Sequence, residues 1–324
     1  TEVNNLNTAR SAFPGSSGAD STSAIYSGGY TTTNVAVAES WNGTNWTEVN
    51  DINTARRGVG SSSTSSTSSL IFSGYASSDS VLTEEWNGTN WTEVADLSTG
   101  RNQIGGAGTS TLGIAFGGNL VTTTDEFMGP GQPVGVWATA ATLNTARDGL
   151  AGIGASSTAA LGAGGNTPPG GYSADTELYN GTSWTEVNNI NQSRSKLTGL
   201  GIQTAALAVA GEESSPTNSA KTETWNGTNW TEVNDLNSAK KRVGAAGTTT
   251  AGLVFGGDPG AKNETESWNG TNWTEVNNLN TGRQGPGSSG IQTSALASGG
   301  YSTTYLAVTE SWNGTRSEER RVGK

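Results

Sequence analysis

The sequence of 324 residues contains no histidine, no cysteine and a single methionine. Because imidazole and thiolate groups are absent, the chain cannot form a Ser-His-Asp or Cys-His nucleophile, a zinc site with nitrogen and sulfur ligands, or a disulfide. We therefore expect no enzymatic activity, no cofactor and no metal. A carboxylate pair or a cation site made only of oxygen ligands stays possible.

Charged and hydrophobic residues are also scarce, at 14% and 32% of the chain, and the formal net charge is −11. An acidic chain with 17 basic residues lacks the positive footprint that binds phosphate backbones, so we expect no nucleic-acid partner. No apolar run reaches the length of about 18 residues that crosses a bilayer, so we expect no membrane insertion. The 47 glycines indicate either an interior filled by small residues or a low-complexity segment.

The sequence is dominated by a repeat. The segment Trp-Asn-Gly-Thr-Asn-Trp-Thr-Glu-Val occurs at Trp41–Val49, Trp86–Val94, Trp225–Val233 and Trp268–Val276, with a close relative at Tyr179–Val187. All 11 tryptophans lie in this motif or its degenerate copies. The spacing gives seven units of about 46 residues, a period typical of propellers and solenoids.

Each unit contains four short runs bounded by Gly, Asn, Ser and Thr, without the 3.6-residue period of a helix, which predicts an all-β fold. Asn-Gly between the two aromatic residues predicts a type I′ hairpin joining the third and fourth strands. Strand alternation then places Glu39, Trp41, Trp46 and Glu48 on one face. The paired tryptophans would pack between blades or, where exposed, stack on sugar rings. A radial arrangement would bury them and leave room only for small side chains at the axis.

The order of these features within each unit resembles the kelch repeat. A basic residue comes first, followed by a strand of small residues, an apolar strand ending in Gly-Gly, an aromatic residue and Trp. The double glycine stands at Gly28-Gly29, Gly117-Gly118, Gly164-Gly165, Gly256-Gly257 and Gly299-Gly300. This resemblance implies a seven-bladed β-propeller with four-stranded blades over residues 1–315. We expect Thr1-Glu2-Val3 to be the N-terminal strand that closes the last blade. An eight-bladed or open array is the alternative.

The composition changes at residues 316–324, Arg-Ser-Glu-Glu-Arg-Arg-Val-Gly-Lys. These nine residues resemble the translation of a common sequencing adapter, a contaminant of metagenomic reading frames. We therefore expect a non-native tail and a natural protein that continues beyond both ends of this chain. A solvated charged tail is the alternative.

One basic residue per unit precedes the first strand and could surround the mouth of a central channel, where it would attract anions such as acidic sugars. The alternative is that each one hydrogen-bonds backbone carbonyls of a neighbouring blade. These residues are Arg10, Arg56, Arg101, Arg147, Arg194, Arg242 and Arg283.

Two sets of carboxylates also repeat. We expect a solvated outer face, with acid–base catalysis or Ca²⁺ binding as the alternative. The set before the first aromatic residue is Glu39, Glu85, Glu126, Glu177, Glu223, Glu266 and Glu310. The set after the second is Glu2, Glu48, Glu93, Glu186, Glu232 and Glu275.

Variable loops after the second strands add candidate binding residues that the repeat itself does not require. These are Tyr172, Glu212, Glu213 and Asp258. Propellers commonly bind ligands through such loops, and drift in unselected loops is the alternative.

We expect a non-enzymatic binding or display module of an extracellular or virion-surface protein, with a glycan or a protein as its ligand. A carbohydrate-active enzyme on a propeller scaffold and a purely structural spacer are the alternatives.

Overall fold

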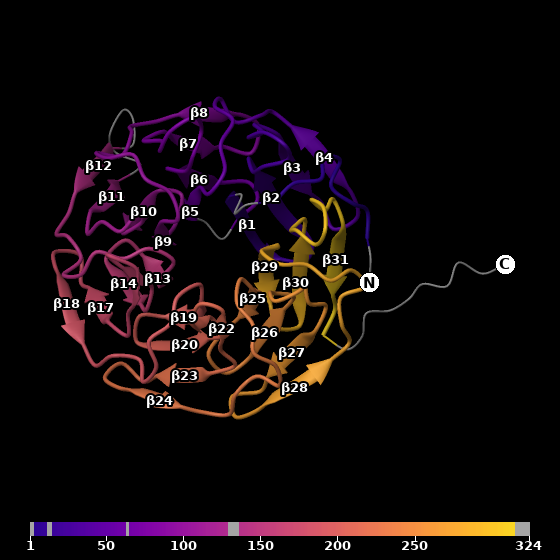
Figure 1. Ribbon diagram of the computed structural model, residues 1–324. Helices are drawn as coiled ribbons and strands as arrows, with labels where there is room; N and C mark the ends of the chain where they lie inside the picture. The colour runs from indigo at the N-terminus through magenta and orange to yellow at the C-terminus, as the bar shows by residue number, and fades with distance from the viewer. Residues whose placement is uncertain (1–2, 12–14, 63–64, 129–135, 315–324) are drawn as a thin grey trace.

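The computed structural model describes residues 3–11, 15–62, 65–128 and 136–314. Within these ranges every regular element is a β-strand, and seven antiparallel sheets surround a central axis as the blades of a propeller (Figure 1). The predicted all-β, seven-bladed propeller is therefore confirmed. No helix of this part of the chain is long and apolar enough to cross a membrane.

Each blade runs outward from the axis in chain order, and blades 1 to 7 are numbered from β1. The innermost strands are β1 (Gly15–Asp20), β5 (Gly60–Ser62), β9 (Gly105–Gly108), β13 (Ala151–Ser156), β19 (Thr198–Ile202), β25 (Gly244–Gly247) and β29 (Gly287–Ile291). The second strands are β2 (Ser23–Ser27), β6 (Ser69–Phe72), β10 (Leu112–Phe116), β14 (Ala159–Ala163), β20 (Ala205–Val209), β26 (Gly252–Phe255) and β30 (Ser294–Ser298).

The outer half of each blade carries the aromatic hairpin. The third strands are β3 (Ala38–Trp41), β7 (Thr83–Trp86), β11 (Thr124–Met128), β17 (Thr176–Tyr179), β23 (Thr222–Trp225), β27 (Thr265–Trp268) and β31 (Thr309–Trp312). The fourth strands are β4 (Trp46–Val49), β8 (Trp91–Glu93), β12 (Val136–Thr139), β18 (Trp184–Val187), β24 (Trp230–Glu232) and β28 (Trp273–Val276). Extra hairpins follow the second strand in blade 4, β15 (Asn166–Thr167) with β16 (Gly171–Tyr172), and in blade 5, β21 (Glu212–Ser214) with β22 (Thr217–Asn218).

In several blades the innermost strand is restricted to small residues because an aromatic ring of a second strand occupies the adjacent space. A Cβ added at Gly60 would lie 2.3 Å from the Phe72 ring, and one added at Gly105 would lie 2.7 Å from the Phe116 ring. Both distances are far below van der Waals contact, so these positions accept only glycine. The expected small-residue lining of the axis is thus a packing requirement.

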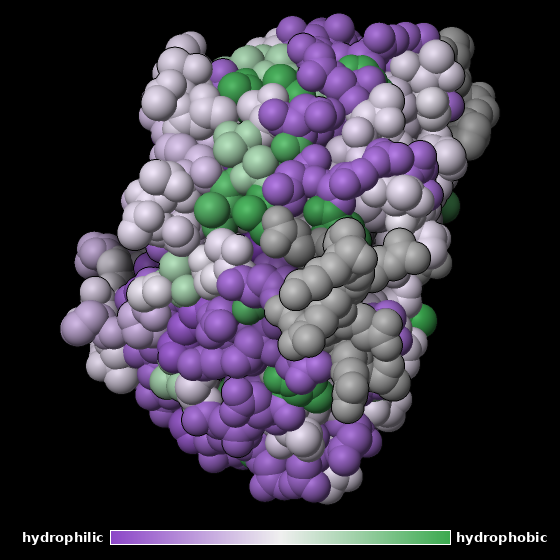
Figure 2. Space-filling model, turned by 90° about the vertical axis from the view of Figure 1, so that its right-hand side faces the viewer, coloured by the Kyte–Doolittle hydropathy of each residue, from purple (hydrophilic) through white to green (hydrophobic). Residues whose placement is uncertain are grey.

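The two aromatic residues of each hairpin stack on one another and are buried, so the tryptophans pack between blades. Trp41 faces Trp46 across the hairpin, with ring centroids 5.5 Å apart, and the corresponding pairs in the next five blades lie 5.1–5.4 Å apart. All second-position tryptophans are at most 8% exposed. Hydrophilic and neutral residues cover most of the rim beside the N-terminus, with hydrophobic residues in small groups (Figure 2).

The second tryptophan also links its blade to the preceding one. In five blades its indole Nε1 donates a hydrogen bond of 2.8–3.0 Å to the hydroxyl of the threonine that begins the third strand of the preceding blade. In blade 2, Trp91 packs in the same cluster as Ala38, which stands where the other blades have threonine. Consequently the buried Nε1 of Trp91 has no hydrogen-bond partner.

The turn between the third and fourth strands differs from the predicted one. The strands have the expected register, but among the hairpin residues only the glycine, such as Gly43 at φ 89°, has a positive φ. Type I′ requires positive φ at both central residues, so the predicted turn type is wrong. Instead, Oδ1 of Asn42 accepts hydrogen bonds from the backbone N–H groups of Thr44 and Asn45 and caps a four-residue loop.

The N-terminal segment packs against blade 7, whose sheet contains three strands. The N–H of Val3 donates to the carbonyl of Thr309 at 3.0 Å, as the N–H of Val94 does to Thr83 in blade 2. The N–H of Leu6 then donates to the carbonyl of Ala307. Val3 therefore lies in the fourth-strand position that the sequence predicts. Residues 1–2 and the tail at residues 316–324 lie outside the described residues.

Replacing Ala38 by threonine should give Trp91 the acceptor that its counterparts have. We expect Ala38→Thr to raise the free energy of unfolding by about 1 kcal/mol, the net value of a buried hydrogen bond. Chemical denaturation of the purified chain measures this change.

Ala38→Val is the matched control, because valine has the shape of threonine without the acceptor, and it should not reproduce the gain. The reverse change, Thr83→Val, should destabilise the chain by leaving Trp137 Nε1 unpaired. Equal stability of the Ala38→Thr and Ala38→Val variants would refute this account of the inter-blade bond.

Candidate functional site

The predicted basic residues are buried in ion pairs rather than exposed at the channel mouth. The side chains of Arg10, Arg56, Arg101, Arg147, Arg194 and Arg283 are 0% exposed, and each pairs with a carboxylate on the third strand of its own blade. Arg147 Nη2 lies 2.6 Å from Glu177 Oε1, and Arg194 Nη2 lies 2.9 Å from Glu223 Oε1. Burial of a charge is tolerated because it is paired and hydrogen-bonded.

The same residues also join neighbouring blades through their backbone. The carbonyl of Arg56 accepts a hydrogen bond of 2.9 Å from the N–H of Gly29. Gly29 is the second residue of the Gly-Gly pair that follows the second strand of the preceding blade. Corresponding bonds run from Gly74, Gly118, Gly165, Gly257 and Gly300 to the carbonyls of the other five arginines, and from Gly211 to the carbonyl of Lys240. Each buried cation therefore connects two blades, with its side chain in one and its carbonyl against the other.

Arg242 does not belong to this set, and its assignment to it is wrong. Lys240 takes the position in blade 6, with Nζ 2.8 Å from Glu266 Oε1 and a fully buried side chain. The alignment follows the buried leucine of the linker, Leu236, which precedes Lys240 as Ile52 precedes Arg56. Arg242 lies two residues later, partly exposed, and its Nη1 is 3.2 Å from Gln284 Oε1.

Five of the seven predicted carboxylates before the first aromatic residue are buried, which contradicts the expected solvated face for this set, whereas Glu85 and Glu126 are partly exposed. The pairing partners in blades 2 and 3 are Glu84 and Asp125, so the sequence-based choice of Glu85 and Glu126 is one residue out of register. The set after the second aromatic residue is exposed as expected, at Glu48, Glu93, Glu186, Glu232 and Glu275. Glu2 lies outside the described residues.

Variable residues surround the inner end of each blade next to this repeated framework. Each second strand is followed by two residues with positive φ. In six blades the residue after these two forms a β-bridge with the residue after the buried cation, as Tyr75 does with Arg57 and Asp258 with Lys241. The linkers that join one blade to the next and the loops between second and third strands lie at the same end of the antiparallel strands. These residue pairs therefore all lie on one side of the propeller, which we call the linker face. The paired positions are Ser11 with Tyr30, Arg57 with Tyr75, Asp148 with Asn166, Ser195 with Glu212, Lys241 with Asp258, and Gln284 with Tyr301.

The second residue after the buried cation has a left-handed backbone. This residue is glycine in some blades, whereas Gln103, Lys196 and Arg242 occupy the position in others, with φ of 53–54°. The backbones of Lys196 and Arg242 are hydrogen-bonded from blade to blade, since Lys196 N–H donates to the carbonyl of Gly149 and Arg242 N–H donates to the carbonyl of Lys196.

A charged cluster occupies the linker face of blades 4 to 6. Glu212 is 1% exposed and accepts hydrogen bonds from the ammonium groups of Lys196 and Lys241, and Lys241 Nζ lies 3.8 Å from Asp258 Oδ2. Burial would raise the pKa of Glu212, but the two lysines hold that pKa below its ordinary value. Burial and the nearby Glu212 carboxylate raise the pKa of Tyr172.

The structure thus brings three of the four predicted loop residues together and adds two lysines to them. Glu213 points elsewhere, since its Oε1 accepts a hydrogen bond from Ser219 Oγ at 2.7 Å. Lys196 and Lys241 were not singled out in the sequence. The signal that could have found them is their place one residue (Lys241) or two residues (Lys196) after the repeated cation of the linker.

An aromatic row occupies the linker face of blades 7, 1 and 2, and it was also missed in the sequence. Its members are Tyr301, Tyr305, Tyr30, Arg57 and Tyr75, all partly exposed. Tyr305 contacts Tyr301 and Tyr30 edge-on, with centroids 5.4 and 5.6 Å apart. The guanidinium of Arg57 lies over two rings, 4.4 Å from the centroid of Tyr30 and 5.1 Å from that of Tyr75.

No protein-family model matches this chain, and no curated protein matches its sequence. Among the residues that the structure describes, no group of three or more acidic side chains is placed to hold a metal ion. The linker face, with its aromatic row and its charged cluster, is therefore the candidate site that the geometry itself provides.

Removing one partner of a buried ion pair should destabilise the propeller strongly. Glu223→Gln leaves the buried guanidinium of Arg194 without a counter-charge, so we expect the free energy of unfolding to fall by about 3–5 kcal/mol. Arg194→Lys should cost less, because Lys240 makes the equivalent contact and because Nε and Nη1 of Arg194 have no hydrogen-bond partner to lose. Urea denaturation measures both. Glu232→Gln on the exposed rim is the control, and an equally small loss for Glu223→Gln would contradict the role of the pair.

The contribution of Glu212 should depend on pH. A carboxylate whose folded-state pKa is lowered stabilises the fold above its ordinary pKa of about 4.3, and this contribution disappears as pH falls through the folded-state value. We therefore expect Glu212→Gln to lower the melting temperature at pH 7 and to have progressively less effect as the pH falls below about 4.3. Thermal unfolding across this range measures the difference. A constant offset at every pH would contradict the electrostatic origin.

Proposed function

We propose that this chain is a non-enzymatic binding module and that the aromatic row of its linker face holds an acidic glycan. The observation that carries the proposal is the row itself, which runs without interruption from Tyr301 to Tyr75 across three blades. No repeat requirement explains these residues, because blades 4 to 6 have Asn166, Glu212 and Asp258 at the positions of Tyr30, Tyr75 and Tyr301.

The chemistry of the row fits a sugar chain. Sugar rings have apolar C–H faces that pack on aromatic rings, and their hydroxyls accept hydrogen bonds from phenol and guanidinium groups. None of the ion pairs in the described ranges involves Arg57, so its charge is free for a carboxylate or sulfate on the glycan. A guanidinium can bind such a group with two parallel hydrogen bonds.

The repeat class and the setting belong to the same proposal. The order of cation, small-residue strand, Gly-Gly and aromatic hairpin supports a kelch-type repeat. The low charge and the surface of Thr, Asn, Ser and Gly suit an extracellular or virion-surface protein that displays the linker face to a glycan.

The charged cluster is the one observation that favours the alternative of a carbohydrate-active enzyme, because it is a single, unrepeated group of titratable residues at the inner end of the blades. General acid–base catalysis works best with pKa values near the working pH. The pKa of Glu212 is lowered and that of Tyr172 is raised, so both move away from neutrality. This direction supports binding over catalysis.

A glycan array probed with the whole chain tests the proposal. We expect binding to sulfated or carboxylated oligosaccharides that weakens as salt rises, and a loss of at least about tenfold in affinity for Tyr30→Ala and for Arg57→Ala, since each removes a central contact. Tyr172→Ala is the matched control on the other half of the linker face and should bind as the unaltered chain does. Absence of glycan binding, or equal loss in the control, would reject the aromatic row as the site.

A further inference from the structure

A hollow opens on the linker face between blades 6 and 7, between the charged cluster and the aromatic row. Its lining comes from the loop after Asp258 of the charged cluster, from the loop after Tyr301 of the aromatic row, and from the linker that joins the two blades. The hollow is open to solvent and has a volume of about 480 Å³, within the range of about 300–1,000 Å³ that ligand pockets have. It is therefore large enough for a small molecule or for one unit of a longer ligand.

The lining of the hollow is polar but uncharged. Two glycines and an alanine leave an apolar ligand little surface to pack on, and none of the described residues that line the hollow carries a charge. Amide and hydroxyl groups can both donate and accept hydrogen bonds, so the lining fits a neutral ligand that is rich in hydroxyls. The polar side chains are those of Asn280, Thr281, Gln284, Ser302 and Thr303.

The framework leaves two of the amide groups free for a ligand. In four blades the linker asparagine that corresponds to Asn280 donates both its backbone N–H and its side-chain amide to the glutamate of the buried ion pair. Asn280 donates its backbone N–H to Glu310, but in the described part of the chain its side-chain amide makes no hydrogen bond. Within the same residues, Gln284 accepts a bond from Arg242 through Oε1, while its Nε2 has no partner.

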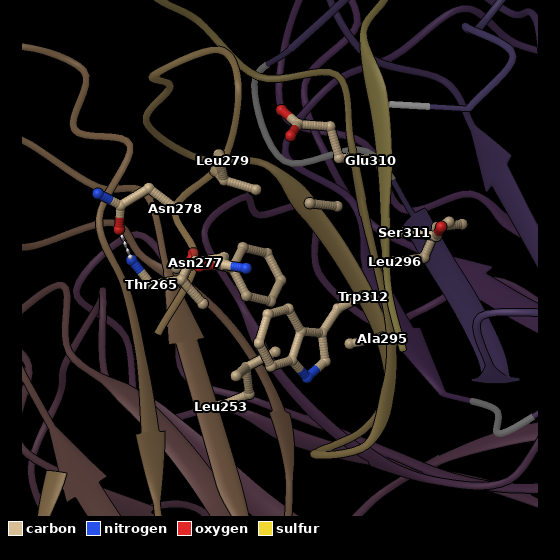
Figure 3. A pocket seen from close by; sticks show the side chains of 12 residues that line it. Leu253, Thr265, Asn277, Asn278, Leu279, Ala295, Leu296, Glu310, Ser311 and Trp312 are labelled. Carbon is tan, nitrogen blue, oxygen red and sulfur yellow. Dashed lines mark hydrogen bonds between the residues drawn. The ribbon is translucent and has the colours of Figure 1, made fainter. Parts of the chain in front are cut away.

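The linker side of the hollow is held in place before any ligand binds. The backbone N–H groups of Asn280 and Thr281 donate to the Glu310 carboxylate at 2.6 and 3.2 Å. Leu279, the residue before Asn280, is buried, and with Glu310 it lines the small pocket between these blades that Figure 3 shows. A ligand in the hollow therefore meets polar groups on a fixed backbone, which lowers the entropic cost of binding.

We propose that the hollow is a subsite for one uncharged sugar unit of the glycan that the aromatic row holds, an inference that rests on the proposed function. Two backbone hydrogen bonds, of 2.8 and 3.0 Å, join Gln284 to Tyr301 at the end of the row, so a glycan lying on the row extends into the hollow with its next unit. Arg57 attracts the acidic groups farther along the row, whereas the hollow offers only amides and hydroxyls. The linker face thus separates acidic from neutral units of one chain.

Neutral monosaccharides test the hollow independently of the row. Saturation-transfer NMR of the whole chain is carried out with glucose, galactose, mannose and N-acetylglucosamine. We expect saturable binding of at least one of them, with a dissociation constant on the order of 1–10 mM, as suits a ligand of this size. Absence of saturable binding for all four would overturn the proposal.

Two variants locate the sugar. Thr303→Trp introduces a bulky side chain from an exposed position on the lining and should abolish binding of the monosaccharide. Asn280→Ala removes the free amide but keeps the backbone N–H that bonds to Glu310, so we expect about fivefold weaker binding. Thr32→Trp is the matched control, because Thr32 is exposed at the same loop position in blade 1, and it should bind the sugar as the unaltered chain does. Binding that is unchanged in both Thr303→Trp and Asn280→Ala would place the sugar elsewhere and overturn the proposal.

Tyr30→Ala distinguishes failure of this inference from failure of the proposed function. This variant should lose acidic glycans on the array but keep the monosaccharide, because the hollow is intact. Loss of the monosaccharide in Tyr30→Ala would place the sugar on the aromatic row and overturn the subsite, while the proposed function would stand. Monosaccharide binding in the hollow without any glycan on the array would reject the aromatic row and support the hollow alone as a sugar site.

The link between the hollow and the row is measured on the same array. Thr303→Trp should bind acidic glycans that end in a neutral hexose about tenfold more weakly than the unaltered chain does, because the terminal unit loses its hydrogen bonds. Glycans made only of acidic units should bind both chains equally. Equal affinity of the two chains for the glycans with a neutral end would overturn the assignment of the hollow to the same ligand.

Discussion

A buried cation in every linker joins two blades of this propeller at one residue. Its side chain pairs with a carboxylate on the third strand of one blade, and its carbonyl accepts the N–H of the glycine that ends the second strand of the blade before. The ion pair must form completely, because a buried charge without a partner costs far more free energy than an exposed one. The cation and its carboxylate are consequently held together in all seven blades, although the number of residues between them varies from blade to blade.

The same contact explains where variation is allowed. Backbone bridges hold two residues next to one another, whatever their side chains are. One is the residue after the cation, and the other follows the two positive-φ residues at the end of the second strand. The ring can therefore carry tyrosines and an arginine in blades 7, 1 and 2 and a lysine–glutamate cluster in blades 4 to 6 without any change in the framework. The framework determines stability, and the neighbouring positions are free to determine recognition.

Much of the fold could be predicted because it is local and repeated. The strand pattern, the outward order of the strands and the pairing of Trp41 with Trp46 all follow from short segments that recur in each unit. The site was less accessible. The sequence pattern predicts Glu85 instead of Glu84 and Arg242 instead of Lys240, because residue type alone does not distinguish neighbouring carboxylates or neighbouring cations. Burial distinguishes them: Glu84 and Lys240 are 0% exposed, whereas their neighbours are partly exposed.

By itself, the sequence determined the number of units, the β-structure and the small residues at the axis, since these depend on periodicity and on side-chain volume. Only the tertiary structure decided which residues became neighbours around the ring. Tyr305 lies against Tyr30 although 275 positions separate them in the sequence. The physical reason is ring closure, which brings the last blade against the first and sets contacts that no single repeat contains.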